Sequence, residues 1–406
     1  MKRAIFFILM ILISAVIFGQ QMMGPPAGQC NFTAENGMTE FPFELVNNHI
    51  IITANLNGDN LVRLVLDTGF PAHGAMLYKT EQIEKLNLQY SGKAMIGSPG
   101  GELKPADILM EASLSFPGVE FVGQYVIVAQ HDEISLKRFS YHDGVIGYSV
   151  LSRFVVDIDF NKKIIKLSKP ENFQYKGKGE ELKIEFERNT PIISCQTSLQ
   201  NGVLEPVKMV IDLGATHALS LDVQKEKQIV PPPRHLKSKA AGVSGEFDII
   251  LGRIDGFQIG KFCFKNVLIS FNDKQMSAMH GSYTNGNLGM DILKRFHLII
   301  DYTGSRIFLE PNNYFNDTFE TNMSGIRYYR NKDKQVVIEN VYDDSPARES
   351  GLKKDDMITM IDGKTVEDIS NNELIEILRQ KGEILELSIL REGRNINKKI
   401  KLRRMI

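Results

Sequence analysis

The 406-residue chain contains no tryptophan, three cysteines and almost no net charge. Cys30, Cys195 and Cys263 cannot all pair within one chain, and their spacing matches no metal site. Cys195 and Cys263 fall in expected strands, where they form either one disulfide or two buried thiols. A formal net charge of −1 gives no global field that would attract nucleic acid, so we expect no nucleic-acid partner.

Long apolar runs are also scarce. The one long run extends from Ala4 to Phe18, after Lys2 and Arg3 and before small and polar residues. This pattern is typical of a secretory signal peptide and is too short for a comfortable membrane span. We therefore predict a signal peptide at residues 1–20 and an exported protein, periplasmic or secreted, without a transmembrane segment. Because Gln29 precedes Cys30 where a small residue would be needed, a lipid anchor at Cys30 is disfavoured.

What the chain does contain is an internal repeat. The first copy has Leu-Asp-Thr-Gly at 66–69 and Gly-Val-Ile-Gly at 144–147; the second has Ile-Asp-Leu-Gly at 211–214 and Gly-Asn-Leu-Gly at 286–289. The Asp and the closing Gly are 80 residues apart in the first copy (147−67) and 77 in the second (289−212). Landmarks that recur in the same order at similar spacing predict two duplicated lobes.

Most of residues 38–312 shows the pattern of short β-strands. Apolar and polar residues alternate at 62–66 and 207–211, just before each Asp, and again at 155–167 and 297–309. Pro231–Pro233 must be a loop. A junction rich in proline and glycine at 170–180 separates the copies. We predict a mainly β protein with one lobe at 38–175 and the other at 176–312.

Asp67 and Asp212 each follow an apolar strand on a glycine-containing turn. A single Asp-x-Gly is most often an ordinary turn, but the duplication favours a pair that meets between the lobes. Two adjacent carboxyl groups cannot both ionise, so they share one proton. The ionised member can then deprotonate a water while the protonated member donates to a scissile carbonyl oxygen.

On these motifs, residues 38–312 resemble a bacterial retropepsin-like aspartyl protease with both lobes in one chain. The resemblance implies a retropepsin- or pepsin-like fold, catalysis by Asp67 and Asp212, and no metal or organic cofactor. It assigns the supporting turns to Thr68, Gly69 and Gly214. It also implies a flap, a β-hairpin that closes over substrate, at the glycine-rich segment that contains Ile96, Gly97, Gly100 and Gly101, with a counterpart at 242–245.

The second copy departs from this family's pattern. Leu213 replaces the usual Thr or Ser, whose hydroxyl braces the site across the lobe interface. Asn287 takes an apolar place in the second closing motif, and Phe70 replaces a small residue in the first copy. These departures keep a second hypothesis open: a peptide-binding or scaffolding protein that retains the fold without the activity.

After residue 312 the pattern changes to a small α+β module. Residues 322–404 resemble a PDZ domain of the kind appended to periplasmic proteases, on Ser-Pro-Ala at 345–347, Gly-Leu at 351–352, Asp-Asp-Met-Ile at 355–358 and Ile-Asp-Gly-Lys at 361–364. A helix is predicted from Asn371 to Gln380, because Ser370 and Glu373 have capping-box spacing.

The PDZ resemblance implies an added peptide strand whose terminal carboxylate is held near 324–327. The expected peptide-binding residues are Gly325, Ile326, Leu374 and Leu378, and the expected ligand is a C-terminal peptide. Leu374 and Leu378 fit the domain core equally well, and both interpretations stay open.

Other hydrolase signals are weak. His73 and His217 follow the two aspartates by six and five residues, but loop histidines are common and the aspartic mechanism needs none. The chain has no Gly-x-Ser-x-Gly and no His-Glu-x-x-His, which disfavours a serine hydrolase and the commonest zinc peptidases. The sequence therefore predicts an exported aspartic endopeptidase that acts on peptide or protein substrates recruited by its PDZ module.

Overall fold

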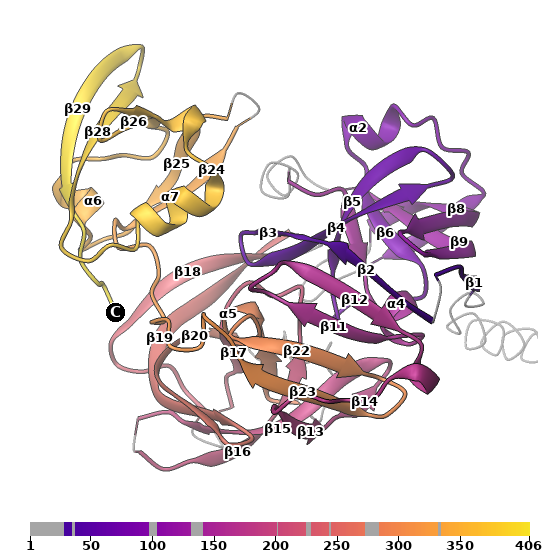
Figure 1. Ribbon diagram of the computed structural model, residues 1–406. Helices are drawn as coiled ribbons and strands as arrows, with labels where there is room; N and C mark the ends of the chain where they lie inside the picture. Colours follow the sequence, from indigo (N-terminus) through magenta and orange to yellow (C-terminus); the bar gives the residue numbers. More distant parts are fainter. Residues whose placement is uncertain are drawn as a thin grey trace, which may run out of the picture.

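The computed structural model describes residues 28–406, except for 35–36, 97–103, 131–140, 201, 225–228, 243–244, 273–283 and 332–333. The signal-peptide prediction for residues 1–20 therefore lies outside the described residues. Within them, no helix has the length and apolar character needed to cross a membrane. The architecture is mainly β, as the alternating sequence pattern predicts (Figure 1).

A central sheet joins the two halves of the repeat. Its strand order is β13-β23-β22-β11-β12-β2, so three strands come from each half. The junction between halves is the antiparallel pair of β11 and β22, in which Asp157 lies opposite Ile299. Phe154 and Phe296 are equivalent in the repeat, and the same offset makes Ile299 the equivalent of Asp157. The pair therefore lies on a pseudo-twofold axis. The strands are β2 (Met38–Pro42), β11 (Val155–Asp159), β12 (Ile164–Ser168), β13 (Glu180–Lys183), β22 (Phe296–Asp301) and β23 (Arg306–Pro311).

Each half also forms a sheet of its own, and the two share one topology. In the first half β5 pairs in parallel with β10, and in the second β16 pairs in parallel with β21 in the matching register. The strand that follows each Asp then pairs antiparallel with that same short strand. The first sheet contains β1 (Gln29–Phe32), β3 (Glu44–Val46), β4 (His49–Leu56), β5 (Asn60–Leu66), β6 (Ala75–Tyr78), β7 (Gly92–Ile96), β8 (Lys104–Phe116), β9 (Val119–Ala129) and β10 (Gly144–Ile146).

The second sheet confirms the duplication read from the sequence. It contains β14 (Glu185–Glu187), β15 (Thr190–Ser198), β16 (Glu205–Ile211), β17 (Leu219–Asp222), β18 (His235–Gly242), β19 (Gly245–Ile259), β20 (Phe262–Asn272) and β21 (Gly286–Leu288). Short helices α4 (Tyr148–Leu151) and α5 (Met290–Leu293) follow the closing motifs, and α2 (Glu81–Glu84) and the 3-10 turn η2 (Pro170–Asn172) lie in connections.

One apolar core extends through both lobes, and a second belongs to the C-terminal module. The first contains Leu64 and Ile158 from one half and Ile211 and Ile300 from the other. Because the lobes share this core and the central sheet, a boundary near 175 separates the repeat units in sequence without dividing the packing. The lobe boundaries stay a prediction.

The C-terminal module has the strand order β24-β25-β26-β28-β29 with α6 and α7 packed on it (Figure 1). Helix α7 starts at Asn371 as predicted, with the Ser370 hydroxyl accepting the Glu373 N–H at 3.2 Å, but it ends at Ile377. The Glu373 carboxylate bonds Lys364 and also accepts the Ser370 backbone N–H, so the capping box forms in both directions. The elements are β24 (Ile326–Arg330), β25 (Val336–Val341), α6 (Pro346–Glu349), β26 (Met357–Ile361), β27 (Lys364–Thr365), η5 (Val366–Asp368), α7 (Asn371–Ile377), β28 (Ile384–Arg391) and β29 (Arg394–Lys401).

Candidate active site

The first carboxylate is positioned by the end of β5. The Asp67 N–H donates to the Ile146 carbonyl at 2.8 Å, which continues the parallel pairing with β10 into the turn. A Cβ on Gly147 would lie 1.9 Å from the Asp67 carbonyl oxygen, so the closing motif needs glycine at this point. The repeat thus places a backbone strand directly behind the aspartate.

The second carboxylate is held in the same way. The Asp212 N–H donates to the Leu288 carbonyl at 2.9 Å, and a Cβ on Gly289 would lie 2.3 Å from the His217 carbonyl oxygen. Both Asp turns therefore rest on the apolar-Gly segment that the sequence placed about eighty residues later.

The two carboxyl groups meet between the lobes and hydrogen-bond each other. Gly69 N–H donates to Asp67 Oδ1 at 2.7 Å, and Gly214 N–H donates to Asp212 Oδ1 at 3.0 Å. The glycines also let each carboxyl approach the opposite turn, because a Cβ on Gly214 would lie 2.4 Å from Asp67 Cγ and one on Gly69 would lie 3.1 Å from Asp212 Oδ1. The structure thus brings together four of the residues that the sequence analysis singled out.

Electrostatics favour one shared proton. Burial, followed by the neighbouring Asp212 charge, raises the pKa of Asp67 to about 8, although the Gly69 and Gly214 N–H groups oppose the shift. Burial also raises the pKa of Tyr78, and the nearby Asp67 charge adds to this upward shift. A carboxyl that keeps its proton near neutral pH, in contact with a second carboxyl, can act as an acid while its partner acts as a base.

Thr68 braces the site across the lobe interface. Its buried hydroxyl donates to the Ile211 carbonyl at 2.6 Å and accepts the Leu213 N–H at 2.8 Å. The side chain of Leu213, which is 0% exposed, packs in the core and offers no hydroxyl in return. The brace that runs from the first lobe to the second is present, and the reciprocal hydroxyl is replaced by an apolar side chain.

Three further residues at the site were missed as contributors by the sequence reasoning. Asn287, which the sequence showed only as a departure, donates from Nδ2 to Asp212 Oδ2 at 2.6 Å. His49 contacts the Gly214 carbonyl through Nε2 at 2.9 Å and the Tyr141 hydroxyl through Nδ1 at 2.7 Å. No local signal marks His49 or Tyr141, because their partners are brought close only by folding.

The histidines considered from the sequence lie elsewhere around the turns. The His73 ring packs edge-on against Tyr148 with centroids 4.9 Å apart, and burial lowers its pKa. His217 lines the cavity, and its carbonyl accepts the Asp291 N–H at 3.1 Å. We assign neither a catalytic role.

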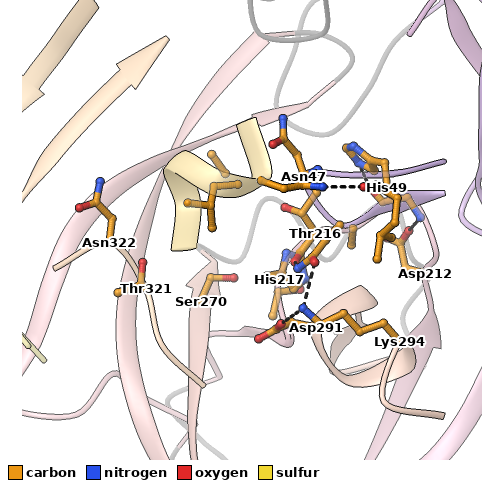
Figure 2. A pocket seen from close by; sticks show the side chains of 18 of the residues that line it. Asn47, His49, Asp212, Thr216, His217, Ser270, Asp291, Lys294, Thr321 and Asn322 are labelled. Carbon is orange, nitrogen blue, oxygen red and sulfur yellow. Dashed lines mark hydrogen bonds and ion pairs between the residues drawn. The ribbon is translucent and has the colours of Figure 1, made fainter. Parts of the chain in front are cut away.

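A cavity of about 1330 Å³ lies over the two aspartates and extends to the C-terminal module. Figure 2 shows His49 and Asp212 at one end and Thr321 and Asn322 at the other, with the yellow ribbon of α7 between them in this view. From α7 and the residues just after it, Ile375, Glu376, Leu378, Arg379 and Gln380 line the cavity. The cavity wall is thus built by both lobes and by the module.

Only part of the predicted flap lies within the described residues. Gly97, Gly100 and Gly101 lie outside the described residues, as do 243 and 244 of the counterpart segment. Ile96 ends β7, which pairs with β8 as a hairpin, and it packs against a small cluster that contains Val65 and Tyr78. The hairpin therefore stems from beside the Asp67 strand, and its role as a flap stays a prediction.

The expected peptide-binding residues of the C-terminal module are largely internal. Ile326, Leu374 and Leu378 are at most 3% exposed and belong to its core. Gly325 has a positive φ of 80°, and a Cβ there would lie 2.2 Å from Ser345 Cβ. The packing therefore agrees with the core interpretation of the two leucines. Strand β24 lies at the edge of its sheet, and peptide binding along it stays a prediction.

The described residues show no cluster of three or more His, Cys, Asp or Glu that could hold a metal ion. Cys30, Cys195 and Cys263 are free thiols, so the disulfide alternative for Cys195 and Cys263 is not realised. Cys195 is buried, which raises the pKa of its thiol, whereas Cys263 is exposed.

Comparison with known proteins agrees with the geometry. Residues 197–292 match the family model for aspartyl proteases, and residues 324–402 match the model for PDZ domains. The chain thus carries an aspartyl-protease domain followed by a PDZ domain, and these matches support a protease with a PDZ module.

Two individual proteins give more distant matches. A probable CtpA-like serine protease of Staphylococcus haemolyticus (strain JCSC1435) is 33% identical over 92 residues, which are 22% of this chain and 18% of that protein. The chain thus spans about a fifth of that relative's length. The crystal structure of an aspartic proteinase from Irpex lacteus matches with a TM-score of 0.45 and 12% identity over 70% of this chain and 99% of the other.

Proposed function

We propose that this chain, which joins an aspartyl-protease domain to a PDZ domain, is an exported aspartic endopeptidase that uses Asp67 and Asp212. The observation that carries the proposal is the meeting of two carboxyl groups from separate lobes beneath one large cavity, with the pKa of Asp67 raised to about 8 by burial and by Asp212. The pair is in a position to hold one proton over a wide pH range.

The reaction then follows from the shared proton. The ionised carboxylate takes a proton from a bound water, whose oxygen attacks the scissile carbonyl carbon, while the protonated carboxyl donates to the carbonyl oxygen. The tetrahedral intermediate collapses when the C–N bond breaks: the protonated carboxyl gives its proton to the leaving nitrogen, and one hydroxyl of the intermediate returns a proton to the other carboxylate, so the pair again holds one proton. Because the two groups titrate as a unit, neither role belongs to one fixed Asp. Gly69 and Gly214 N–H groups hold the carboxyls in place.

Residues of the PDZ module line the same cavity as the two aspartates. The Asn372 side chain donates from Nδ2 to the Leu45 carbonyl at 2.8 Å and accepts the Asn47 N–H at 3.1 Å, which fixes α7 to the turn between β3 and β4. The PDZ module is proposed to recruit a peptide or protein, most simply by a C-terminal segment, and to hold it where the chain can continue over the dyad.

The test is cleavage of a degenerate peptide library from pH ~3 to ~8 by the mature protein and by Asp67→Asn and Asp212→Asn. We expect the wild type to cut and both variants to be inactive. Loss in Asp67→Asn alone would show that Asp212 is not catalytic. Absence of cleavage by the wild type at every pH would refute the peptidase.

The alternative function is peptide binding without catalysis, and the observation that favours it is the apolar Leu213 in place of a bracing hydroxyl. The two functions differ in their dependence on the carboxyls. A binder holds a peptide equally well in Asp67→Asn, whereas a protease binds a peptide with a hydroxyethylene at the scissile position much more weakly in that variant.

Export through residues 1–20 is proposed on the sequence pattern alone. Cell fractionation of the full chain, followed by N-terminal sequencing of the mature protein, tests it. A mature product that still begins at Met1 and stays in the cytoplasm would contradict it.

A further inference from the structure

We infer that His49, held by Tyr141, is a positioning residue for the dyad that braces the Asp212 turn from the opposite lobe. The inference rests on the proposed function, because it concerns how the same two carboxyls are held. It arises from one contact between lobes, from His49 at the start of β4 to Gly214 in the turn of Asp212.

Both backbone polar groups of Gly214, its N–H and its carbonyl, are hydrogen-bonded. Its N–H donates to Asp212 Oδ1 at 3.0 Å and also bonds the Asp67 carboxyl. Its carbonyl contacts His49 Nε2 at 2.9 Å. Fixing the carbonyl fixes the orientation of the turn, and with it the N–H that both carboxyls use. His49 thereby acts on the reacting groups through the Gly214 backbone.

The hydrogen-bond partners define the protonation of the His49 ring. A carbonyl oxygen can only accept, so Nε2 carries the proton, and in a neutral ring Nδ1 accepts from the Tyr141 hydroxyl at 2.7 Å. The Tyr141 oxygen is in turn hydrogen-bonded by the Asn47 side chain. The bonds run in one direction from Asn47 to Gly214, an arrangement in which each bond strengthens the next.

The surroundings of the ring favour this neutral state. His49 is 7% exposed, and burial lowers its pKa although the Gly214 carbonyl and the Asp212 charge oppose the shift. The groups that face it are Tyr141, His142 at a ring-centroid distance of 5.8 Å, and Asp212. A protonated ring would turn an N–H toward the Tyr141 hydroxyl and break the chain of bonds.

At the equivalent position of the second lobe, the repeat has a threonine in place of His49. Ile51 pairs with Val65 and Ile192 with Val210, so Thr190 takes in the second lobe the register position of His49. The neighbouring contacts are symmetric: Asn48 Nδ2 donates to the Thr216 carbonyl at 2.9 Å, and Asn189 Nδ2 donates to the Pro71 carbonyl at 3.1 Å.

The asymmetry of His49 matches the asymmetry of the hydroxyl brace. Thr68 supplies its hydroxyl to the second lobe, whereas Leu213 supplies none to the first. His49 adds to the Thr68 bonds in the same direction, because both side chains come from the first lobe and hold the turn of Asp212. The Asp212 turn is thus braced by two residues of the opposite lobe.

The experiment compares His49→Ala, His49→Gln, Tyr141→Phe and the register-matched control Thr190→Ala with the wild type, on a peptide that the wild type cleaves. We expect His49→Ala to lower kcat at least about tenfold with KM changed less than threefold, because misplaced catalytic groups lose rate and not substrate contacts. His49→Gln, whose amide can donate to Gly214, should recover part of the rate. Tyr141→Phe should give a kcat between those of His49→Ala and the wild type, and Thr190→Ala should match the wild type.

A double-mutant cycle of His49→Ala and Tyr141→Phe tests whether the two side chains act through one bond. The double variant is expected to lose no more activity than His49→Ala alone, because Tyr141 acts through His49. Thermal unfolding of each variant separates loss of the brace from loss of the fold. Full kcat and an unchanged pH profile in His49→Ala would overturn the inference while the Asp→Asn variants still test the protease.

If the wild type cleaves nothing, the proposed function fails and the positioning inference is tested by titration. Carbon-13 NMR of the aspartate carboxyls should show a shifted titration of the pair in His49→Ala and none in Thr190→Ala. Identical titration curves in the two variants would overturn the inference in that case.

Discussion

At the scale of single residues, the site depends on how closely two turns approach. Gly214 provides the clearest example, because a Cβ at this position would lie 2.4 Å from Asp67 Cγ. The sequence showed the glycine as part of a turn. The structure shows that its lack of a side chain is what allows the opposite carboxyl to come near.

We predict that Gly214→Ala abolishes activity, with a loss of at least about 100-fold in kcat/KM, because the new methyl group displaces Asp67. The measurement is cleavage of a wild-type substrate, with thermal unfolding to show that the fold persists. Gly92→Ala is the matched control, since a Cβ on Gly92 meets nothing within 4 Å. Retention of full activity in Gly214→Ala would contradict the close approach.

The raised pKa of Asp67 predicts a dependence of stability on pH. Burial and Asp212 raise this pKa to about 8, so the folded state binds more protons than the unfolded state between pH ~4 and ~8. The contribution of this group to stability is therefore fully present below pH ~4 and is lost as the pH rises through about 8.

Denaturant unfolding of wild type and Asp67→Asn from pH ~4 to ~9 measures this contribution. We expect the free energy of unfolding of the wild type to fall relative to that of Asp67→Asn across the interval. Activity should fall over the basic part of the same interval, when the shared proton leaves. Parallel stability curves for the two proteins would show that the pKa of Asp67 is not raised.

At the scale of secondary-structure elements, α7 shows how local chemistry places a helix. Its start was predictable because Ser370 caps the Glu373 N–H, whereas its end fell short of the expected Gln380. Leu378 extends the apolar face one residue beyond Ile377, but it is the C-terminal cap of the helix, and its carbonyl accepts the Met323 N–H at 2.7 Å.

We predict that Ser370→Ala destabilises the PDZ module by about 1 kcal/mol, because the helix loses its N-terminal cap. Thermal or urea unfolding of the full chain, monitored by a spectroscopic probe in the module, measures the change. Thr365→Ala is the matched control, since Thr365 precedes η5 without a side-chain capping bond. Equal losses in the two variants would mean that the Ser370 cap contributes nothing specific.

At the scale of the whole molecule, the PDZ module is attached to the protease body by polar contacts. Arg327 pairs with Glu246 at 2.8 Å. Glu320, in the connection before the module, pairs with Arg253 at 3.1 Å and also bonds Arg404 after the last strand, and both Arg327–Glu246 and Arg253–Glu320 are largely shielded from solvent. Together with Asn372 at the turn between β3 and β4, these contacts place α7 against the cavity that contains the dyad.

We predict that Asn372→Ala speeds hydrogen exchange of the Asn47 amide by about five- to tenfold, because a net hydrogen bond contributes about 1 kcal/mol. Hydrogen–deuterium exchange of the folded protein measures it, with Asn371→Ala as the control from the adjacent position of α7. Unchanged exchange at Asn47 would show that the module does not hold this turn in solution.

By itself the sequence determined the duplication, the strands that lead to Asp67 and Asp212, the glycine turns and the C-terminal module. Each of these depends on periodicity, turn residues or caps that act over a few neighbouring positions. The meeting of the two aspartates could be inferred from the repeat, because duplicated lobes related by a pseudo-twofold axis bring equivalent residues together.

The tertiary structure alone decided what surrounds them. The bond from His49 to Gly214, the support from Asn287 and the entry of α7 into the cavity wall join residues that are far apart in the chain. Their positions follow from the pairing of β11 with β22, from the shared core and from the docking of the module. No local pattern encodes such contacts, because each depends on the relative orientation of whole packed elements.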